Sequence, residues 1–149
     1  ALWNTRSTCA RRWSWPGWPW REGEVPVGCV IVRDGAVVGR GRNRRETAQT
    51  ALGHAELEAI AQACRTLGGW RLAGCALYVT LEPCPMCAGA IVNARIPAVY
   101  YGAKDDKAGC CGSVLNLFEE RFNHHPRIYG RVLEAECAAL LQEFFQSLR

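Results

Sequence analysis

The chain has 149 residues, of which 49% are apolar and 21% charged, and its formal net charge is +4 at pH 7. This length and balance are typical of one globular domain, and they exclude a disordered, collagen-like or fibrous chain. The mildly basic charge is compatible with a nucleic-acid partner without requiring one.

The sequence gives no sign of export or membrane insertion. No stretch approaches the ~18 consecutive apolar residues of a membrane helix, and the first residues lack the pattern of a signal peptide. The nine cysteines are an odd number spread along the chain, which favours free thiols in a reducing compartment over a disulfide scaffold. We therefore expect a cytoplasmic protein with no membrane segment.

The N-terminal residues differ from the rest of the chain. Five of the six tryptophans fall within the first twenty residues, where Pro16 and Pro19 prevent a regular helix. Because tryptophan has a single codon, a shift of one base would turn this run into apolar residues typical of a first helix. We interpret residues 1–23 as an atypical segment, either frame-shifted or disordered, and residues 24–149 as one domain.

Strands and helices alternate after this segment. Asp34-Gly35 is a turn signal between two apolar runs and predicts a hairpin, and helical periodicity followed by Gly68-Gly69 predicts a helix that ends there. This alternation predicts an α/β sandwich with antiparallel pairing at one end. The expected elements are strands at 27–32 and 37–43, a helix at 53–67, a strand at 76–81, a helix at 84–94, a strand at 98–102, a long loop at 103–126, a strand at 127–132 and a helix at 133–148.

Two short motifs open the first two predicted helices. His54-Ala55-Glu56 opens the first, and Cys84-Pro85-Met86-Cys87 opens the second. Two cysteines three positions apart lie on one helix face, and the positive end of the helix dipole favours their thiolates. Together with one imidazole they suit Zn²⁺, and three protein ligands leave a fourth position for water, as in catalytic sites.

Glu56 is the candidate proton carrier of this site. It lies two residues from His54, so the two side chains need not bind the same ion. A carboxylate beside an activated water can accept its proton and pass it to a leaving group.

Other interpretations of the cysteines stay open at this point. A Cys-x-x-Cys pair is also typical of redox proteins, and a closed structural zinc site would take a fourth ligand from Cys110 or Cys111. A redox pair has no need of His-x-Glu, and a zinc-stabilised binding module has little use for Glu56. The two motifs together therefore favour a catalytic zinc site.

His-x-Glu with Pro-Cys-x-x-Cys is the signature of zinc nucleobase deaminases, and longer stretches resemble bacterial tRNA-specific adenosine deaminases. The resemblance implies a cytidine-deaminase-like three-layer α/β/α sandwich with a five-stranded mixed sheet. It also implies a homodimer with one Zn²⁺ per chain, which hydrolytically converts the wobble adenosine of a tRNA anticodon stem-loop into inosine. The stretches are Glu-Val-Pro-Val-Gly at 24–28, Gly-Arg-Asn at 41–43, Thr-Leu-Glu-Pro-Cys-Pro-Met-Cys-Ala-Gly-Ala at 80–90, Tyr-Gly-Ala-Lys-Asp at 101–105, Gly-Ser at 112–113 and Phe-Asn-His at 122–124.

The resemblance also implies substrate contacts. Asn43 would hydrogen-bond the flipped base, and the backbone around Ala55 and Cys84 would help to hold the base and the water. The ribose-phosphate chain would meet Asp105, Lys107 and His124. The alternatives are that Asn43 only ends its strand and that the last three are solvated surface residues.

Two further points concern specificity and helix start. Four arginines, at positions 40, 42, 44 and 45, either attract phosphates or form a solvated edge. Gly53 stands near the position where the family usually has a threonine before its histidine, so we expect the first helix to start less firmly.

The runner-up function is a small-molecule deaminase of guanine or cytosine, and the polar loop at 103–126 favours RNA.

Overall fold

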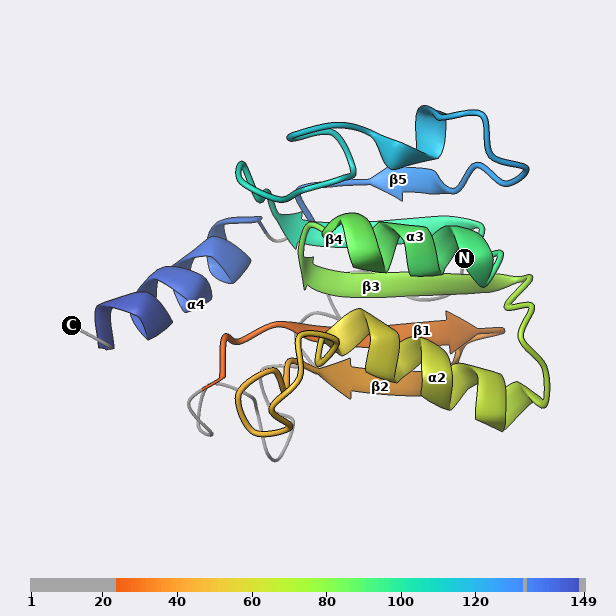
Figure 1. Ribbon diagram of the computed structural model, residues 1–149, viewed down its shortest axis with the longest axis horizontal. Helices are drawn as coiled ribbons and strands as arrows, with labels where there is room; N and C mark the ends of the chain where they lie inside the picture. Colours follow the sequence, from red (N-terminus) through yellow and green to blue (C-terminus); the bar gives the residue numbers. More distant parts are fainter. Residues whose placement is uncertain (1–23, 133, 148–149) are drawn as a thin grey trace.

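The computed structural model describes residues 24–132 and 134–147, and Figure 1 shows how they are arranged. Strands and helices alternate through the first two thirds of this range, as the sequence predicts. The elements are β1 (Gly28–Arg33), β2 (Ala36–Arg42), α2 (Ala55–Leu67), β3 (Cys75–Leu81), α3 (Pro85–Asn93), β4 (Ala98–Ala103), the short 3₁₀ helix η2 (Leu117–Glu119), β5 (Arg127–Tyr129) and α4 (Glu134–Ser147).

The five strands form one mixed sheet in the order β2-β1-β3-β4-β5. β1 pairs antiparallel with β2 and β3, and β3, β4 and β5 run parallel. The predicted hairpin is confirmed: Asp34 and Gly35 both have positive φ angles, 50° and 78°, which a two-residue type I′ turn requires. The expected five-stranded mixed sheet is therefore present.

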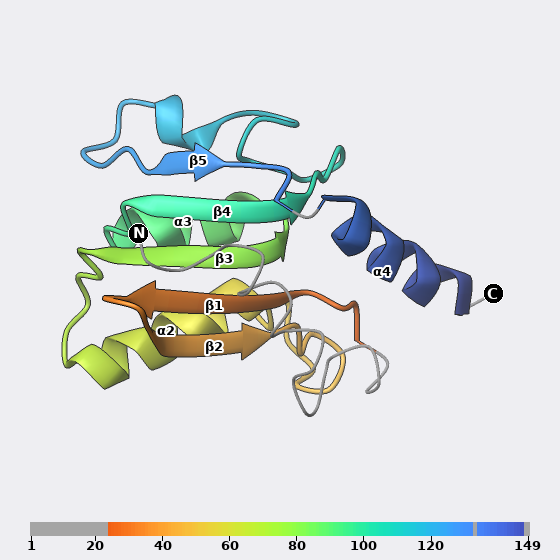
Figure 2. The ribbon, with the colours of Figure 1, turned by 180° about the vertical axis from the view of Figure 1, so that it is seen from behind.

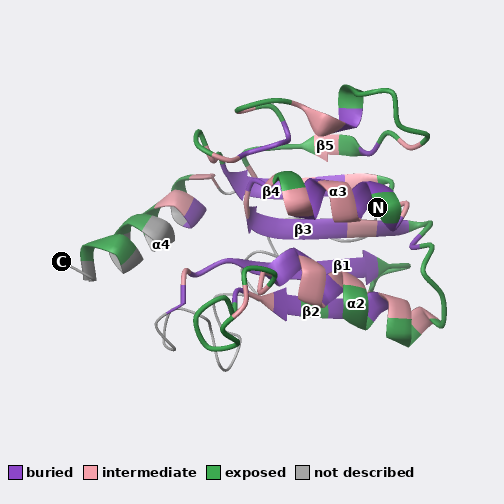
Figure 3. Cartoon of the chain, viewed as in Figure 1, coloured by how far each residue is buried: buried purple, intermediate pink, exposed green. Residues whose placement is uncertain are grey.

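α2 and α3 cover the same face of the sheet, and Figure 2 shows the opposite face without them. The strands place alternate residues between sheet and helices, among them Ile31, Leu77 and Val99, which are fully buried. Close approach of α2 to β2 depends on glycine, because a Cβ on Gly41 would lie 1.9 Å from the Ala55 carbonyl oxygen. Figure 3 shows this burial along the central strands.

The carboxyl end of the chain differs from the sequence-based expectation in its bounds. The strand predicted at 127–132 ends at Tyr129; Arg131 takes a positive φ of 61°, and the Val132 amide still donates to the Tyr101 carbonyl of β4 at 3.0 Å. α4 contacts β4 through Cys137, which is buried and packs against Gly102. In both views α4 extends beyond the carboxyl end of β4.

Two expectations concern parts that the structure does not test. The interpretation of residues 1–23 as frame-shifted or disordered lies outside the described residues. Among the described residues, no helix is long and apolar enough to cross a membrane.

Candidate functional site

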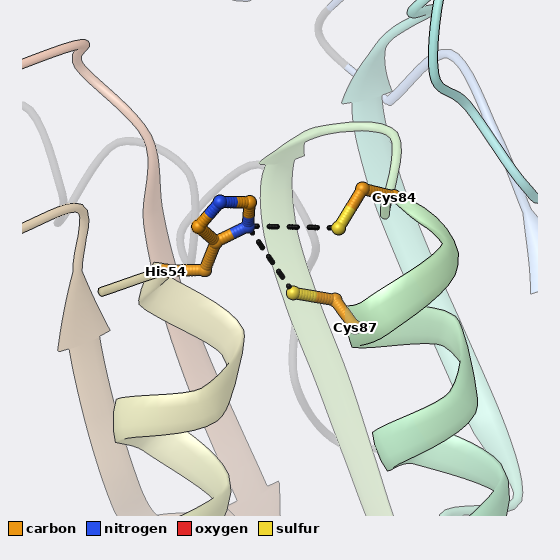
Figure 4. A group of neighbouring side chains, drawn as sticks. All are labelled: His54, Cys84 and Cys87. Atoms are coloured by element: carbon orange, nitrogen blue, oxygen red, sulfur yellow. Dashed lines mark hydrogen bonds between the residues drawn. The ribbon is translucent and has the colours of Figure 1, made fainter. Parts of the chain in front are cut away.

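The two helix starts that carry the predicted motifs lie side by side at the carboxyl end of β3. His54 is the N-cap residue of α2 and Cys84 that of α3, both with extended backbone angles. Pro85 occupies the first turn of α3, where the missing N–H costs nothing. The parallel placement of the two helices therefore brings the imidazole to the thiols, as Figure 4 shows.

The three side chains converge on one point. His54 Nδ1 lies 3.6 Å from Cys84 Sγ and 3.5 Å from Cys87 Sγ, and the three potential ligand atoms lie within 4.8 Å of one another. A tetrahedral zinc ion with Zn–S of about 2.3 Å and Zn–N of about 2.05 Å would hold its nitrogen and sulfur ligands roughly 3.6 Å apart. The side chains therefore fit a shared metal ion.

The two cysteines differ in the direction in which their pKa values are shifted. Hydrogen bonding from Cys87, and then from His54, lowers the pKa of Cys84 to about 4. The pKa of Cys87 is raised, first because its thiol is hydrogen-bonded to Cys84 and then because it is buried. Cys84 is thus a thiolate at neutral pH before any metal binds, and only a thiolate is a good metal ligand.

Glu56 lies in the first turn of α2 and lines the same site. Its side chain is 4% exposed, and burial raises its pKa to about 7. A carboxyl group that titrates near the working pH can both accept and donate a proton during a reaction. Its environment therefore suits the predicted role as a proton carrier.

The alternative interpretations of the cysteines receive no support from the described residues. Cys84 and Cys87 are free thiols. Cys110 and Cys111 are buried but do not join the group of potential metal ligands, so the described part of the chain offers three protein ligands and no fourth cysteine.

A pocket of about 250 Å³ opens beside the three side chains. This is just below the roughly 300–1,000 Å³ of pockets for drug-sized molecules, and it suits a small planar group such as one nucleobase. The lining residues are Val25, Val27, Asn43, Arg45, His54, Ala55, Glu56, Leu81, Glu82, Cys84, Asp105 and Ala108.

Three of the predicted substrate-binding residues line this pocket: Asn43, Ala55 and Asp105. Asn43 is 7% exposed; its Oδ1 accepts from the Arg45 amide at 3.2 Å, and its Nδ2 donates to the Val25 carbonyl at 3.4 Å. Its amide is thereby held in place with one Nδ2 hydrogen left for a ligand. Asn43 also directly follows β2, which ends at Arg42, so these two hydrogen bonds fit the strand-end interpretation as well.

The other two predicted residues lie outside the pocket lining. Lys107 is exposed, and its backbone amide donates to Asp105 Oδ1 at 3.1 Å, which places it in the loop that forms the rim. The half-buried His124 ring bonds to the Ile96 carbonyl at 2.7 Å, and Ile96 precedes β4, at the opposite end of the sheet from the metal ligands. The structure therefore does not bring His124 to the pocket of its own chain.

Two carboxylates beside the pocket were not predicted as site residues. Glu24 is 0% exposed and accepts from the amides of Glu46 and Thr47 at 3.0 and 2.7 Å. Glu82 is 2% exposed and accepts from Asp105, Cys111 and Ser113. Each carboxylate therefore holds a neighbouring loop against the site. In the sequence, these two residues stand out only because they lie in stretches that resemble the family.

Gly53 has a different role from the one expected. α2 starts without a side-chain cap hydrogen bond, as predicted. A Cβ on Gly53 would lie 2.8 Å from the Arg45 amide nitrogen, and the Gly53 carbonyl accepts from the Arg44 amide at 2.7 Å. The absence of a side chain therefore allows the loop to close against residues 44–45.

Known proteins are similar to this chain in sequence and in fold. The model of the MafB19-like deaminase family matches residues 5–149. A tRNA-specific adenosine deaminase of Bacillus subtilis (strain 168) is 53% identical over 129 residues, which cover 86% of this chain and 80% of the relative.

Two solved structures share the fold. One, from biochemical and structural studies of A-to-I editing by tRNA:A34 deaminases at the wobble position of transfer RNA, has a TM-score of 0.76, 42% identity and 91% coverage of both chains. A guanine deaminase from Bacillus subtilis has a TM-score of 0.62 and 32% identity, and covers 97% of this chain and 95% of its own. The chain belongs to the tRNA-specific adenosine deaminase family, within the MafB19-like deaminases.

Proposed function

We propose that this chain is a zinc-dependent hydrolase that converts the wobble adenosine of a tRNA anticodon loop into inosine, and that it works in the cytoplasm as a homodimer. The observation that carries the proposal is the arrangement of His54, Cys84 and Cys87 around one point, with buried Glu56 beside them at a pocket sized for one base. The 53% identity to a tRNA-specific adenosine deaminase supports adenosine in tRNA as the substrate.

His54, Cys84 and Cys87 would hold the zinc ion. Two sulfurs and one nitrogen suit zinc better than magnesium or calcium, which prefer oxygen ligands. Bound zinc supplies Lewis acidity, which lowers the pKa of water enough for attack at neutral pH.

Glu56 carries the proton through the reaction. Its carboxylate accepts a proton from the attacking water, whose oxygen forms a bond to C6 of adenine. As that bond forms, the electron pair of the C6–N1 double bond moves to N1. The Glu56 carboxyl then donates its proton to the amino nitrogen, and the pair on N1 forms the double bond to C6 again as the bond to the amino nitrogen breaks and ammonia leaves. Movement of the hydroxyl proton from the C6 oxygen to N1 gives inosine. The balance is adenosine and water to inosine and ammonia, and the near-neutral pKa of Glu56 suits both transfers.

The remaining pocket residues position the base. Asn43 and the backbone at Ala55 are proposed to hydrogen-bond it and Asp105 to meet the adjoining ribose-phosphate; all three residues line the pocket, which supports these roles. Lys107 and His124 are proposed to contact the ribose-phosphate chain. Since His124 lies at the opposite end of its own sheet, this contact would be made to RNA bound by the partner subunit or to a more distant part of the same RNA.

RNA fits the architecture better than a free base does. Flipping one base into a pocket costs a few kcal/mol and is least costly in a single-stranded loop. One base cannot identify a tRNA, so recognition needs the flanking nucleotides, and the polar loop over residues 103–126 provides a surface for them.

The homodimer is proposed from the family together with exposed apolar side chains. Val114, Leu115 and Phe122 are 55%, 45% and 48% exposed on the same long loop. Apolar side chains gathered on one segment are typical of contact surfaces. Light scattering on the purified protein tests this directly: a mass of one chain would contradict the homodimer.

A guanine deaminase is the second candidate, because a Bacillus subtilis guanine deaminase covers nearly the whole chain at 32% identity. One assay separates the two functions. Zinc-loaded protein is incubated in parallel with an anticodon stem-loop carrying wobble adenosine, free adenosine, guanine and cytosine. Inosine in the stem-loop alone is the expected result, whereas rapid turnover of guanine with an inert stem-loop would favour the second candidate.

A further inference from the structure

Four arginines follow one another around the end of β2, and the structure separates their surroundings. The half-buried Arg42 lies within β2 and the exposed Arg40 two residues before it. Arg44 turns towards α2, where its Nε lies 3.1 Å from Glu58 Oε2. Of these four arginines, Arg45 alone lines the pocket.

The guanidinium of Arg45 makes no direct polar contact within the described part of the chain. Over residues 24–132 and 134–147, it forms neither an ion pair nor a side-chain hydrogen bond, although its charge lies close enough to the Glu24 carboxylate to help lower the pKa of that group. Its neighbour Glu24 directs its carboxylate to the amides of residues 46 and 47 and to the Thr47 hydroxyl. Arg45 is exposed and lines the pocket, so it offers there a positive charge that no direct ion pair among the described residues holds.

The backbone of Arg45 is held although its side chain is not. The Arg45 amide donates to Asn43 Oδ1 at 3.2 Å, and its carbonyl accepts from the Thr50 amide at 3.2 Å. The same Asn43 side chain lines the pocket. The backbone of Arg45 is thus fixed two residues from Asn43, the residue proposed to hold the base, while the guanidinium remains available for a ligand.

We propose that Arg45 binds a backbone phosphate next to the adenosine in the pocket and thereby selects an RNA chain over a free base. This inference rests on the proposed function and names the group that recognises the polymer. A base within an RNA chain cannot enter the pocket without bringing its ribose and two flanking phosphates to the rim. A guanidinium pairs with a phosphate through two parallel hydrogen bonds, which gives position as well as charge.

The test measures how binding depends on salt. A fluorescein-labelled anticodon stem-loop with wobble adenosine is titrated with zinc-loaded protein carrying Glu56→Gln, so that binding is measured without turnover. Anisotropy gives the Kd from 50 to 300 mM NaCl. Arg45→Gln is compared with Arg45→Lys, and the matched control is Arg44→Gln, which removes the same charge from the adjacent residue.

We expect Arg45→Gln to raise the Kd about 10-fold at the lowest salt and to reduce the slope of log K against log salt by about 0.7, which is one phosphate contact on a single strand. Arg45→Lys restores the slope, and Arg44→Gln changes the Kd less than twofold. Because Arg45 is exposed, the melting temperature should stay within a degree of the parent, which excludes a folding defect.

Two results would overturn the inference. One is an unchanged slope in Arg45→Gln, and the other is an equal change in Arg44→Gln, which would indicate general attraction instead of a specific contact. Measuring turnover by the protein with native Glu56 separates a failure of the inference about Arg45 from a failure of the proposed function. If that protein forms inosine but the slope does not move, only the role of Arg45 fails; if it forms none, the proposed function fails whatever the slope.

Discussion

Glu82 provides the sharpest test of how the site is held together. It directly precedes Pro83 and Cys84, and its carboxylate accepts four hydrogen bonds from the loop that follows β4. Oε1 takes the Asp105 amide at 3.1 Å and the Ser113 hydroxyl, and Oε2 takes the amides of Cys111 and Ser113 at 2.9 and 3.1 Å. The perturbation is Glu82→Gln, which keeps the shape and removes one acceptor oxygen.

The magnitude follows from the two ways in which glutamine can lie. With its NH₂ in place of Oε2, two backbone amides lose their acceptor. With its NH₂ in place of Oε1, the Ser113 hydroxyl can rotate to accept and only the Asp105 amide is lost, so this orientation is cheaper. One unsatisfied buried donor costs about 1–3 kcal/mol, and the remaining bonds lose their charge assistance. We expect a total loss of about 2–4 kcal/mol, which lowers Tm by about 4–16 °C for a domain of this size.

The pH dependence gives an independent check. Burial raises the pKa of Glu82, but the hydrogen bonds from Ser113, Asp105 and Cys111 outweigh it, so the pKa lies below its ordinary value. A lowered pKa in the folded state means that the carboxylate stabilises the fold fully above its unfolded pKa of about 4.3. This contribution is lost as the pH falls through the lower, folded value. The difference in Tm between the parent and Glu82→Gln should therefore be constant from pH 6 to 8 and shrink below about pH 4.

The assay is thermal unfolding by circular dichroism at fixed zinc concentration, because bound metal adds its own stabilisation. Glu46→Gln is the matched control: its side chain is exposed, and its Tm should change by less than about 2 °C. A Tm of Glu82→Gln within a degree of the parent at pH 7 would refute the assignment of these hydrogen bonds as the anchor of the loop.

Three further predictions concern the metal site and the packing beneath it. Glu56→Gln should keep one zinc per chain by elemental analysis and lower kcat about 10²–10⁴-fold, the usual contribution of a general acid–base; full activity would remove Glu56 from the mechanism. Cys87→Ser should lose both zinc and turnover, whereas Cys110→Ser should keep both, and loss of zinc in the latter would revive the closed four-ligand site. Gly41→Ala should lower the free energy of unfolding in urea by about 1–3 kcal/mol, because its Cβ would lie 1.9 Å from the Ala55 carbonyl oxygen; an unchanged midpoint would show that α2 moves freely from β2.

Local signals predicted the frame of the site well. The hairpin turn, the two helix starts and the three potential metal ligands were all readable from short stretches, since each depends on residues within a few positions of one another. His54 and Cys84 were expected at the first turns of their helices, and both are N-cap residues one position before the first helical residue. The start of α3 follows from the local chemistry of Pro85 in its first turn, whereas neither N-cap residue forms a side-chain cap hydrogen bond.

Contacts between distant residues were not readable in the same way. Nothing local to Glu82 shows that residues 105–113 will fold back onto it, since the partners lie 23 to 31 positions away. The same applies to His124, whose ring meets Ile96 across 28 positions. For such residues, a stretch shared with a family marks importance but not the contact that causes it.

Local and long-range contacts hold different parts of the site: local contacts position the potential metal ligands, and long-range contacts position the loops at the rim of the pocket. The potential metal ligands and Glu56 lie at the starts of α2 and α3. Their geometry therefore depends on how these two helices pack against the sheet. Arg45 and Asp105 lie on loops to which Glu24 and Glu82 offer acceptor oxygens for backbone amides. Changes in these loops can therefore alter which nucleotides reach the pocket while the metal ligands stay in place. A guanine deaminase and a tRNA:A34 deaminase both share this fold, so we expect the loops at the rim, and not the frame beneath them, to make the choice of substrate.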